Sequence, residues 1–162
     1  MSPRLWTRSS ISWKGSGMTD KSYPPEILRS IRKEEWISEN PPYMSAFLFD
    51  KYVRNTDGYR EMSVTWFYDK SSLSMIRSII HDDECIFHGG LALIRKESVD
   101  AISQEYPGML LYEMKPTGRN PHHGNILIRA AKTIDERMIA ADIARSAVFY
   151  GINDDIPCSN GS

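Results

Sequence analysis

Two adjacent histidines, His122 and His123, lie in a short segment rich in turn-forming residues, Arg-Asn-Pro-His-His-Gly at positions 119–124. Asn-Pro and a following glycine favour a turn, and the apolar residues after it indicate a strand, so we expect the imidazoles at the mouth of that strand. An imidazole titrates near neutral pH and can act as a general acid or base or bind a metal ion. It can also hydrogen-bond a backbone carbonyl and hold the turn. All three roles stay open for this pair.

Only one of these two histidines is expected to serve a given site, because adjacent side chains on a strand face opposite ways. A metal ion would need His or carboxylate partners at a suitable spacing, and the sequence shows no such set, so we expect no metal and no cofactor. Arg119, Asn120 and Lys115 accompany the histidines and are candidate binding residues. Arginine and lysine side chains are suited to holding phosphate.

His88 is a second candidate acid or base if the protein is an enzyme. It precedes Gly89 and Gly90 inside an apolar run at positions 85–94 that is typical of a strand. Glycines inside a strand indicate a bulge or a close backbone approach, which would expose the His88 ring. A phosphate-binding loop should instead open a helix, so the glycine pair favours the bulge.

The composition is that of a globular protein, with 41% hydrophobic and 25% charged residues and a formal net charge of -1. Residues 1–17 contain three basic residues and no acid, which leaves the remainder mildly acidic and disfavours a nucleic-acid surface. No apolar run is long enough to span a membrane. The two cysteines, Cys85 and Cys158, are too few for a disulfide framework, so we expect free thiols and a cytoplasmic protein.

The order of the elements predicts an α+β fold, a single domain with a small mixed or antiparallel sheet and helices packed on one side. We expect residues 1–17 to be a disordered extension ahead of a second possible start at Met18, residues 18–152 to form the domain, and residues 153–162 to be a flexible tail. Strands are predicted at 61–67, 85–94, 109–112 and 125–129, and the type of the segment 44–49 stays open.

Four helices are predicted between these strands. The first begins at Pro24-Pro25, and the second is capped by Ser71 and carries one apolar face. A third helix covers residues 96–105. The last has a capping box formed by Thr133 and Glu136, and its apolar face comprises Ile134, Met138, Ala141, Ala144 and Val148.

Several short segments along residues 27–128 resemble a group of short bacterial proteins of unassigned activity. The segments are an early Arg29, Ser45-Ala46-Phe47, Met62-Ser63-Val64, Gly89-Gly90-Leu91-Ala92 and the Asn-Pro-His-His-Gly turn. The group has a Ser-x-x-Phe segment, a Leu-Ser-Val strand and an Asn-Pro-x-His ending, and its members occur beside genes of bacterial conflict and defence systems. The resemblance implies a shared fold and a focal role for His123, but no enzyme class. Ser45 is a further candidate binding residue. Here Met62 replaces the usual leucine and Gly124 the usual alanine.

Two hypotheses on function therefore stand. In the first, the protein is a noncatalytic binding or accessory module in a bacterial defence or toxin-related system and engages a protein partner through surplus aromatic side chains. In the second, it is a small hydrolase or transferase that acts on a nucleotide or nucleic acid, with His123 as general acid or base. Convergence of Arg29, Ser45, Ser63, His88 and His123 in one pocket would favour the second hypothesis.

Overall fold

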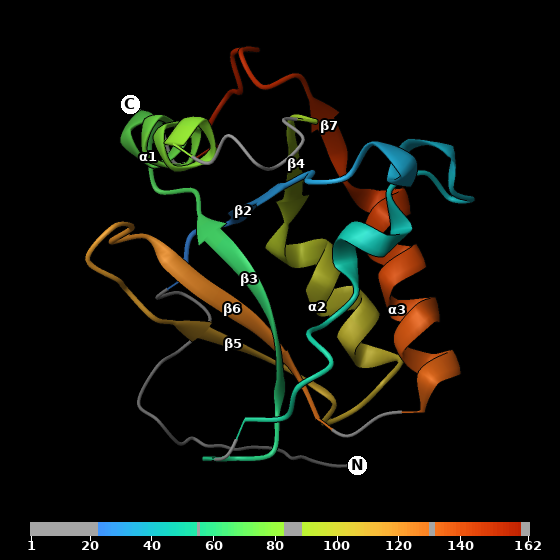
Figure 1. Ribbon diagram of the computed structural model, residues 1–162. Helices are drawn as coiled ribbons and strands as arrows, with labels where there is room; N and C mark the ends of the chain where they lie inside the picture. Colours follow the sequence, from blue (N-terminus) through green and yellow to red (C-terminus); the bar gives the residue numbers. More distant parts are fainter. Residues whose placement is uncertain (1–22, 55, 83–88, 130–131, 160–162) are drawn as a thin grey trace.

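The central strand β3 (Arg60–Trp66) alternates apolar and polar residues, and its Met62, Val64 and Trp66 side chains are buried in the larger core. The computed structural model describes residues 23–54, 56–82, 89–129 and 132–159 (Figure 1). Within them the strands form one antiparallel sheet in the order β5-β6-β3-β2-β4-β7. The bounds of the other strands are β2 (Glu26–Ser30), β4 (Leu91–Arg95), β5 (Leu110–Met114), β6 (His123–Ile128) and β7 (Val148–Tyr150). The predicted α+β class is confirmed.

Helices cover both faces of this sheet. The larger core joins one face to α2 (Lys96–Gln104), α3 (Thr133–Ser146) and the 3-10 turns η3 (Glu34–Ser38) and η4 (Met44–Phe47). A smaller core joins the opposite face to α1 (Lys70–Asp82) (Figure 1). The neighbours Ile27 and Leu28 belong to different cores, as the alternation along a strand requires. The helix α1 is thus the exception to the expectation that all helices pack on one side.

The first predicted helix is wrong, because the residues after Pro25 form strand β2. Both Ile27 and Leu28 are fully buried, since β2 lies inside the sheet and carries helices on both of its faces. A strand buried on both faces shows a continuous apolar run, which periodicity alone does not separate from a short helix. The segment 44–49, whose type was left open, contains η4.

The predicted cap of α1 is wrong by two residues. The helix begins at Lys70, and the Asp69 carboxylate accepts a hydrogen bond from the backbone N–H of Ser71 at 2.9 Å. Hydrogen bonds from the hydroxyl and backbone N–H of Ser71 lower the pKa of Asp69 below the usual aspartate range. The predicted apolar face is confirmed for Leu73, Ile76 and Ile80, which are buried.

The predicted capping box of α3 is also wrong. Thr133 is the first helical residue, and the N-cap residue Lys132 makes no side-chain capping hydrogen bond. The Glu136 carboxylate instead receives two hydrogen bonds from Arg60, at 3.1 and 2.5 Å, and one from the backbone N–H of Phe49 at 3.3 Å. Glu136 therefore ties α3 to β3 and to the segment after η4.

The buried face of α3 differs from the predicted one. Ile134 and Met138 are 65% and 51% exposed, whereas Ile139 and Ile143 are fully buried. Ala141 and Ala144 are buried as predicted, but Val148 lies in β7. The buried face of α3 therefore centres on Ile139 and Ile143 rather than on Ile134 and Met138.

The other predicted elements correspond to β3, α2, β5 and β6, with ends shifted by a few residues. Strand β4 begins at Leu91, after the glycine pair. The predicted strand residues 85–88, among them Cys85 and His88, lie outside the described residues, as does the predicted extension 1–17.

Residues 153–159 do not fit the expected flexible tail. Ile156 is fully buried in the smaller core, and the Lys70 ammonium group bonds to the Asp155 carboxylate at 2.8 Å. The backbone N–H of Ser159 donates to the Glu26 carboxylate at 2.7 Å. This segment thus links the start of α1 to the start of β2.

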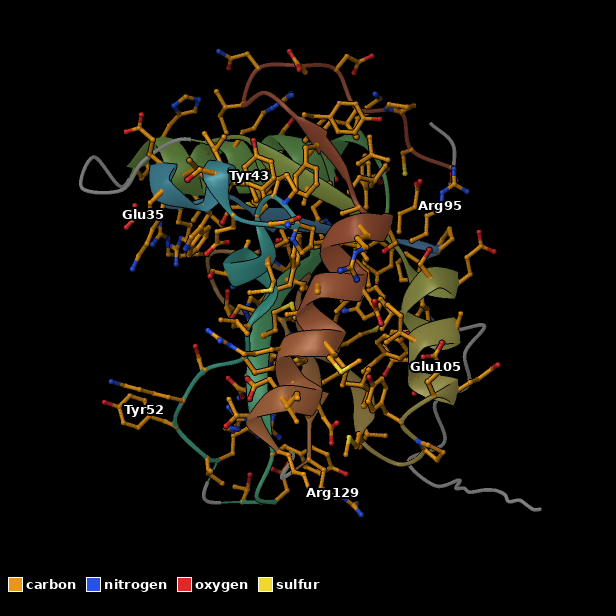
Figure 2. All side chains as sticks on the ribbon, turned by 90° about the vertical axis from the view of Figure 1, so that its right-hand side faces the viewer. Glu35, Tyr43, Tyr52, Arg95, Glu105 and Arg129 are labelled. Atoms are coloured by element: carbon orange, nitrogen blue, oxygen red, sulfur yellow. The ribbon has the colours of Figure 1, made fainter. Side chains whose placement is uncertain are left out.

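The surface gives limited support to an aromatic recognition patch. Among the aromatic side chains of the described residues, Tyr52 alone is mostly exposed, at 75%, and it extends away from the body in Figure 2. Phe47, Trp66 and Phe67 are fully buried.

In the described part of the chain, no helix has both the length and the apolar character needed to cross a lipid bilayer.

Candidate functional site: a cationic pocket beside α1

The site begins where β2 and β3 separate. β2 pairs with β4 along all five of its residues, but its recorded pairing with β3 comprises only Ile27 with Trp66 and Leu28 with Thr65. Past this point the Arg29 guanidinium links the two sides: its Nε donates to the Ala46 carbonyl at 2.8 Å and its Nη1 to the Ser63 carbonyl at 2.6 Å. Arg29 therefore bridges η4 and β3 beyond the end of the strand pairing.

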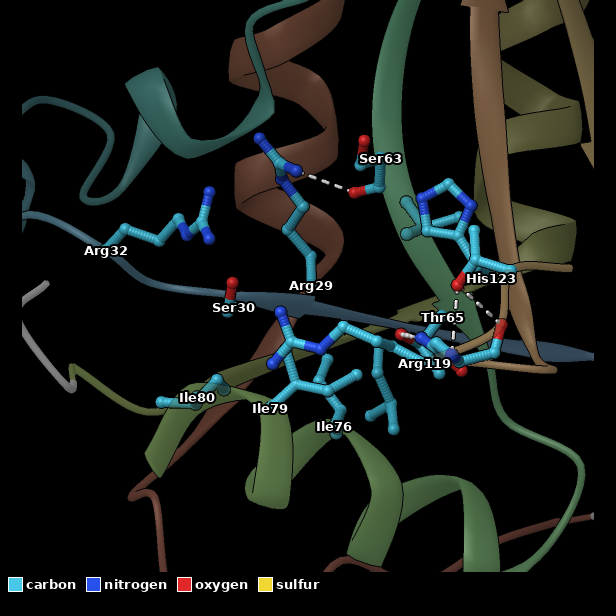
Figure 3. A pocket seen from close by; sticks show the side chains of 14 residues that line it. Arg29, Ser30, Arg32, Ser63, Thr65, Ile76, Ile79, Ile80, Arg119 and His123 are labelled. Carbon is cyan, nitrogen blue, oxygen red and sulfur yellow. Dashed lines mark hydrogen bonds between the residues drawn. The ribbon is translucent and has the colours of Figure 1, made fainter. Parts of the chain in front are cut away.

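A pocket of about 340 Å³ opens at this separation (Figure 3). Its volume lies within the range of small-molecule sites. Aliphatic side chains of α1, β2 and β3 form one part of the lining, namely Leu28, Val64, Ile76, Ile79 and Ile80. The remaining lining is polar or cationic and comes from β2, β3 and the turn that precedes β6. No carboxylate lines this pocket among the described residues.

Arg29 is the most constrained cation of the pocket. Burial and, to a smaller extent, the nearby charge of Arg32 lower the pKa of Arg29 to about 10, although the charge of Asp50 acts in the opposite direction. Arg29 is thus still cationic at neutral pH. It forms no ion pair with any described carboxylate, and its two recorded hydrogen bonds go to neutral carbonyls.

The Arg29 guanidinium has N–H groups that make no recorded hydrogen bond to a described residue. It carries five N–H groups, of which the two recorded bonds use one on Nε and one on Nη1. Among the described residues, Asn125 Oδ1 is the sole buried side-chain nitrogen or oxygen without a hydrogen-bond partner. Because Arg29 Nη2 has no recorded hydrogen bond and is not such a buried atom, it is accessible from outside the protein, and Arg29 itself lines the pocket.

Two further arginines line the same pocket. Arg32 is exposed just after β2, and in Figure 3 its side chain extends toward the hollow beside Arg29. The Arg119 side chain reaches across α1 in the same view. Its one recorded ion pair is with Asp82 at 3.7 Å, and both side chains are about two-thirds exposed. Such an exposed pair is weak, so Arg119 is available to a ligand.

His123 lines the pocket from the first position of β6. Its Nδ1 lies 3.0 Å from the Lys115 carbonyl oxygen. Because a carbonyl only accepts hydrogen bonds, this contact requires a proton on Nδ1, and in the neutral ring Nε2 then presents a lone pair. No described residue has a recorded hydrogen bond with Nε2. His123 can therefore accept a hydrogen bond or a proton from a bound molecule.

Asn120 builds the turn that presents Arg119 and His123. Its side-chain amide donates to the Thr65 hydroxyl at 3.0 Å, and its side-chain oxygen accepts from the His122 backbone N–H at 3.0 Å. Its carbonyl accepts from the His123 backbone N–H at 3.1 Å. Asn120 is only 6% exposed, so it positions the turn.

The remaining predicted site residues lie elsewhere. His122 does not line the pocket and packs against Tyr68, with ring centroids 5.0 Å apart. Ser45 donates through its backbone N–H and its hydroxyl to the Glu39 carboxylate. The Lys115 ammonium group is exposed and lies 3.8 Å from the Glu61 carboxylate. His88 is outside the described residues.

The structure thus brings Arg29, Ser63, Arg119, Asn120 and His123 together and leaves Ser45 apart. Arg32 and the α1 residues Ile76, Ile79 and Ile80 were not predicted to be part of a site. A helix was predicted from Pro25 onward, whereas Arg29 and Arg32 lie at the end of an interior strand. Nothing in the sequence indicates the separation of β2 from β3.

A second pocket, of about 460 Å³, lies near the start of α2 and is less suited to a charged ligand. Its most buried cation, Lys96, is 5% exposed and bonds to the Asp100 carboxylate at 3.1 Å. The Lys96 ammonium group also lies 4.6 Å from the centre of the Tyr112 ring. Its charge is therefore already compensated, in contrast to that of Arg29.

Within the described residues, no group of three or more His, Cys, Asp or Glu side chains is placed to hold a metal ion. No protein-family model, curated protein or solved structure matches this chain. The assignment of a function therefore rests on the pocket alone.

Proposed function

We propose that this protein binds a phosphate-bearing ligand in the pocket between α1 and the separated strands β2 and β3, with Arg29 as its central anion-binding residue. The observation that carries this proposal is a half-buried guanidinium that has unused N–H groups and no carboxylate partner among the described residues. Partial removal of a charge from water without a counter-charge is unfavourable, and a bound anion offsets that cost. Arg32 and Arg119 supply further positive charge, which suits a multiply charged phosphate better than a single carboxylate.

This proposal favours the ligand-handling hypothesis over the accessory module. Arg29, Ser63 and His123 line one pocket, which is the arrangement expected for binding or chemistry on a small molecule. The aromatic surface that suggested a protein partner is reduced to Tyr52 among the described residues. We also propose a cytoplasmic location, which the free thiol of Cys158 supports. The proposed bacterial defence setting is supported by the resemblance to the short bacterial proteins described above.

His123 is proposed to act on the bound ligand as a hydrogen-bond acceptor or general base. Its tautomer is set by the Lys115 carbonyl, and Nε2 is the ring atom left for the ligand. As a general base, Nε2 would take the proton of a ligand O–H or N–H that lies within hydrogen-bond reach.

Calorimetric titration with inorganic pyrophosphate tests the proposal. We expect binding by the wild-type protein and a several-fold weaker affinity for Arg119→Gln, because the variant loses one charge at the pocket rim. Arg145→Gln is the matched control: Arg145 is 61% exposed and pairs with Asp142 on α3, away from the pocket. It should bind as the wild type does.

Arg29→Lys provides the stronger perturbation, because it keeps the charge but loses the planar arrangement of donors. We expect it to bind pyrophosphate roughly tenfold to a hundredfold more weakly, the loss of a charge-assisted hydrogen bond. Its unfolding midpoint, measured alongside, shows whether the fold survives the loss of the bridge to Ala46 and Ser63. Absence of pyrophosphate binding by the folded wild type at millimolar concentrations, or an equal loss in Arg145→Gln, would refute the proposal.

A further inference from the structure

We infer that the ligand of this pocket is a mononucleotide whose base lies against the aliphatic wall of α1 while its phosphate meets Arg29, Arg32 and Arg119. The inference rests on the proposed phosphate site and adds the chemical class of the group that carries the phosphate. Three features support it: the aliphatic wall, the unpartnered polar groups beside it, and the volume of the pocket.

The aliphatic wall lies beside the cations. Ile76 and Ile80 occur four residues apart on α1, and Ile79 adjoins them at the pocket, half-buried. Figure 3 shows these three side chains on the helix below the β2 ribbon, with the Arg119 side chain above the helix and the Arg29 and Arg32 side chains on the other side of the ribbon. A free phosphate ion gains nothing from an aliphatic surface, whereas the flat face of a nucleobase does, because burying apolar area is favourable.

Polar groups without partners distinguish a nucleotide from an alkyl phosphate. The hydroxyls of Ser30 and Ser63 and the Nε2 atom of His123 have no recorded hydrogen bond with any described residue, and all three residues line the pocket. Ribose hydroxyls and the edge of a base would satisfy such groups. An alkyl chain would leave them unpaired as water is displaced, at a cost in free energy.

The dimensions agree with a ligand of this class. A volume of about 340 Å³ is at the small end of ligand pockets, which suits one nucleotide better than a dinucleotide.

Competition calorimetry distinguishes the base from the phosphate. We expect AMP, GMP, CMP or UMP to bind at least tenfold more tightly than ribose 5-phosphate, because only the nucleotide covers the aliphatic wall. We expect hexyl phosphate to bind more weakly than the best nucleotide, because it leaves the serine hydroxyls and His123 Nε2 unpaired.

Ile79→Asn tests the wall directly. Ile79 is only half-buried, so this change spares the core, and it should weaken nucleotide binding by roughly three- to tenfold while ribose 5-phosphate binds unchanged. Ile134→Asn, at a 65% exposed position on α3, is the control and should alter neither affinity.

Two results would overturn the inference alone: ribose 5-phosphate that binds as tightly as every nucleotide, or hexyl phosphate that binds more tightly than all of them. Either result would contradict the nucleotide but not the phosphate site. Absence of pyrophosphate binding by the wild-type protein would instead contradict both the proposed function and this inference.

Discussion

Removing the Glu136 carboxylate should destabilise the protein far more than removing the Thr133 hydroxyl, although the sequence pattern assigns both residues to one helix cap. Glu136 accepts two hydrogen bonds from Arg60 and one from the backbone of Phe49. Thr133 makes no capping hydrogen bond. The substitutions Glu136→Ala and Thr133→Ala therefore distinguish the contacts seen in the structure from the capping box predicted from the sequence.

The magnitude follows from the geometry of the pair. The side chains of Arg60 and Glu136 are 17% and 11% exposed, and both Glu136 oxygens are engaged. Each hydrogen bond to a charged group contributes about 1.5–3 kcal/mol, and removal of one partner leaves the other charge partly buried. Because some exposure remains, we expect Glu136→Ala to lower the free energy of unfolding by about 2–4 kcal/mol. Thr133→Ala should lower it by less than about 0.5 kcal/mol.

Urea unfolding, followed by far-ultraviolet circular dichroism, measures these differences for the wild type and each variant. Adding Arg60→Ala and the double variant completes a double-mutant cycle, and we expect a coupling of about 1–3 kcal/mol between Arg60 and Glu136. A larger loss for Thr133→Ala than for Glu136→Ala, or a coupling near zero, would show that α3 is held by its cap and that this reasoning fails.

Three further predictions concern packing, the histidine turn and pH. A Cβ atom at Gly124 would lie 2.2 Å from an indole nitrogen, so Gly124→Ala should cost about 1–3 kcal/mol in urea unfolding, whereas Gly118→Ala, with open space around it, should not. His123→Ala should weaken nucleotide binding several-fold by calorimetry, and His122→Ala should not, because only His123 lines the pocket; equal effects would refute this. Because folding lowers the pKa of Asp69, the ionised carboxylate stabilises the folded state. This contribution is complete above the ordinary aspartate pKa and is lost as the pH falls through the lowered value. The loss of thermal stability in Asp69→Ala should thus be full at neutral pH and shrink in acid, and a pH-independent loss would contradict it.

The sequence correctly predicted those elements whose hydrophobic pattern fits only one type of secondary structure. The alternation of Met62, Val64 and Trp66 identified β3, and the spacing of Leu73, Ile76 and Ile80 identified the buried face of α1. Local signals suffice where a segment has one buried face and one exposed face.

The failures occur where tertiary contacts override local signals. β2 is buried on both faces, so its apolar run carries no period that separates a strand from a helix. Glu136 fits a capping box by spacing, but the guanidinium of Arg60, 76 residues away, binds its carboxylate. No spacing rule anticipates a partner at that separation.

The candidate site was predictable only in part, for the same reason. The turn chemistry around Asn120 indicated that His123 would stand at a strand end, and β6 does begin at His123. The pocket itself depends on the separation of β2 from β3 and on the position of α1 beside it. These are properties of the assembled sheet, so the role of Arg32 and of the aliphatic wall emerges only from the structure.

The most direct test of the phosphate site is to observe the Arg29 guanidinium while phosphate is added. Nitrogen-15 NMR spectra of the arginine side chains can be recorded during a pyrophosphate titration, with the Arg29 signal assigned by its absence from Arg29→Lys. We predict that the Arg29 signal shifts progressively and yields the dissociation constant found by calorimetry, while that of the distant Arg145 stays fixed. Saturable pyrophosphate binding that leaves the Arg29 signal unchanged would contradict the assignment of this pocket.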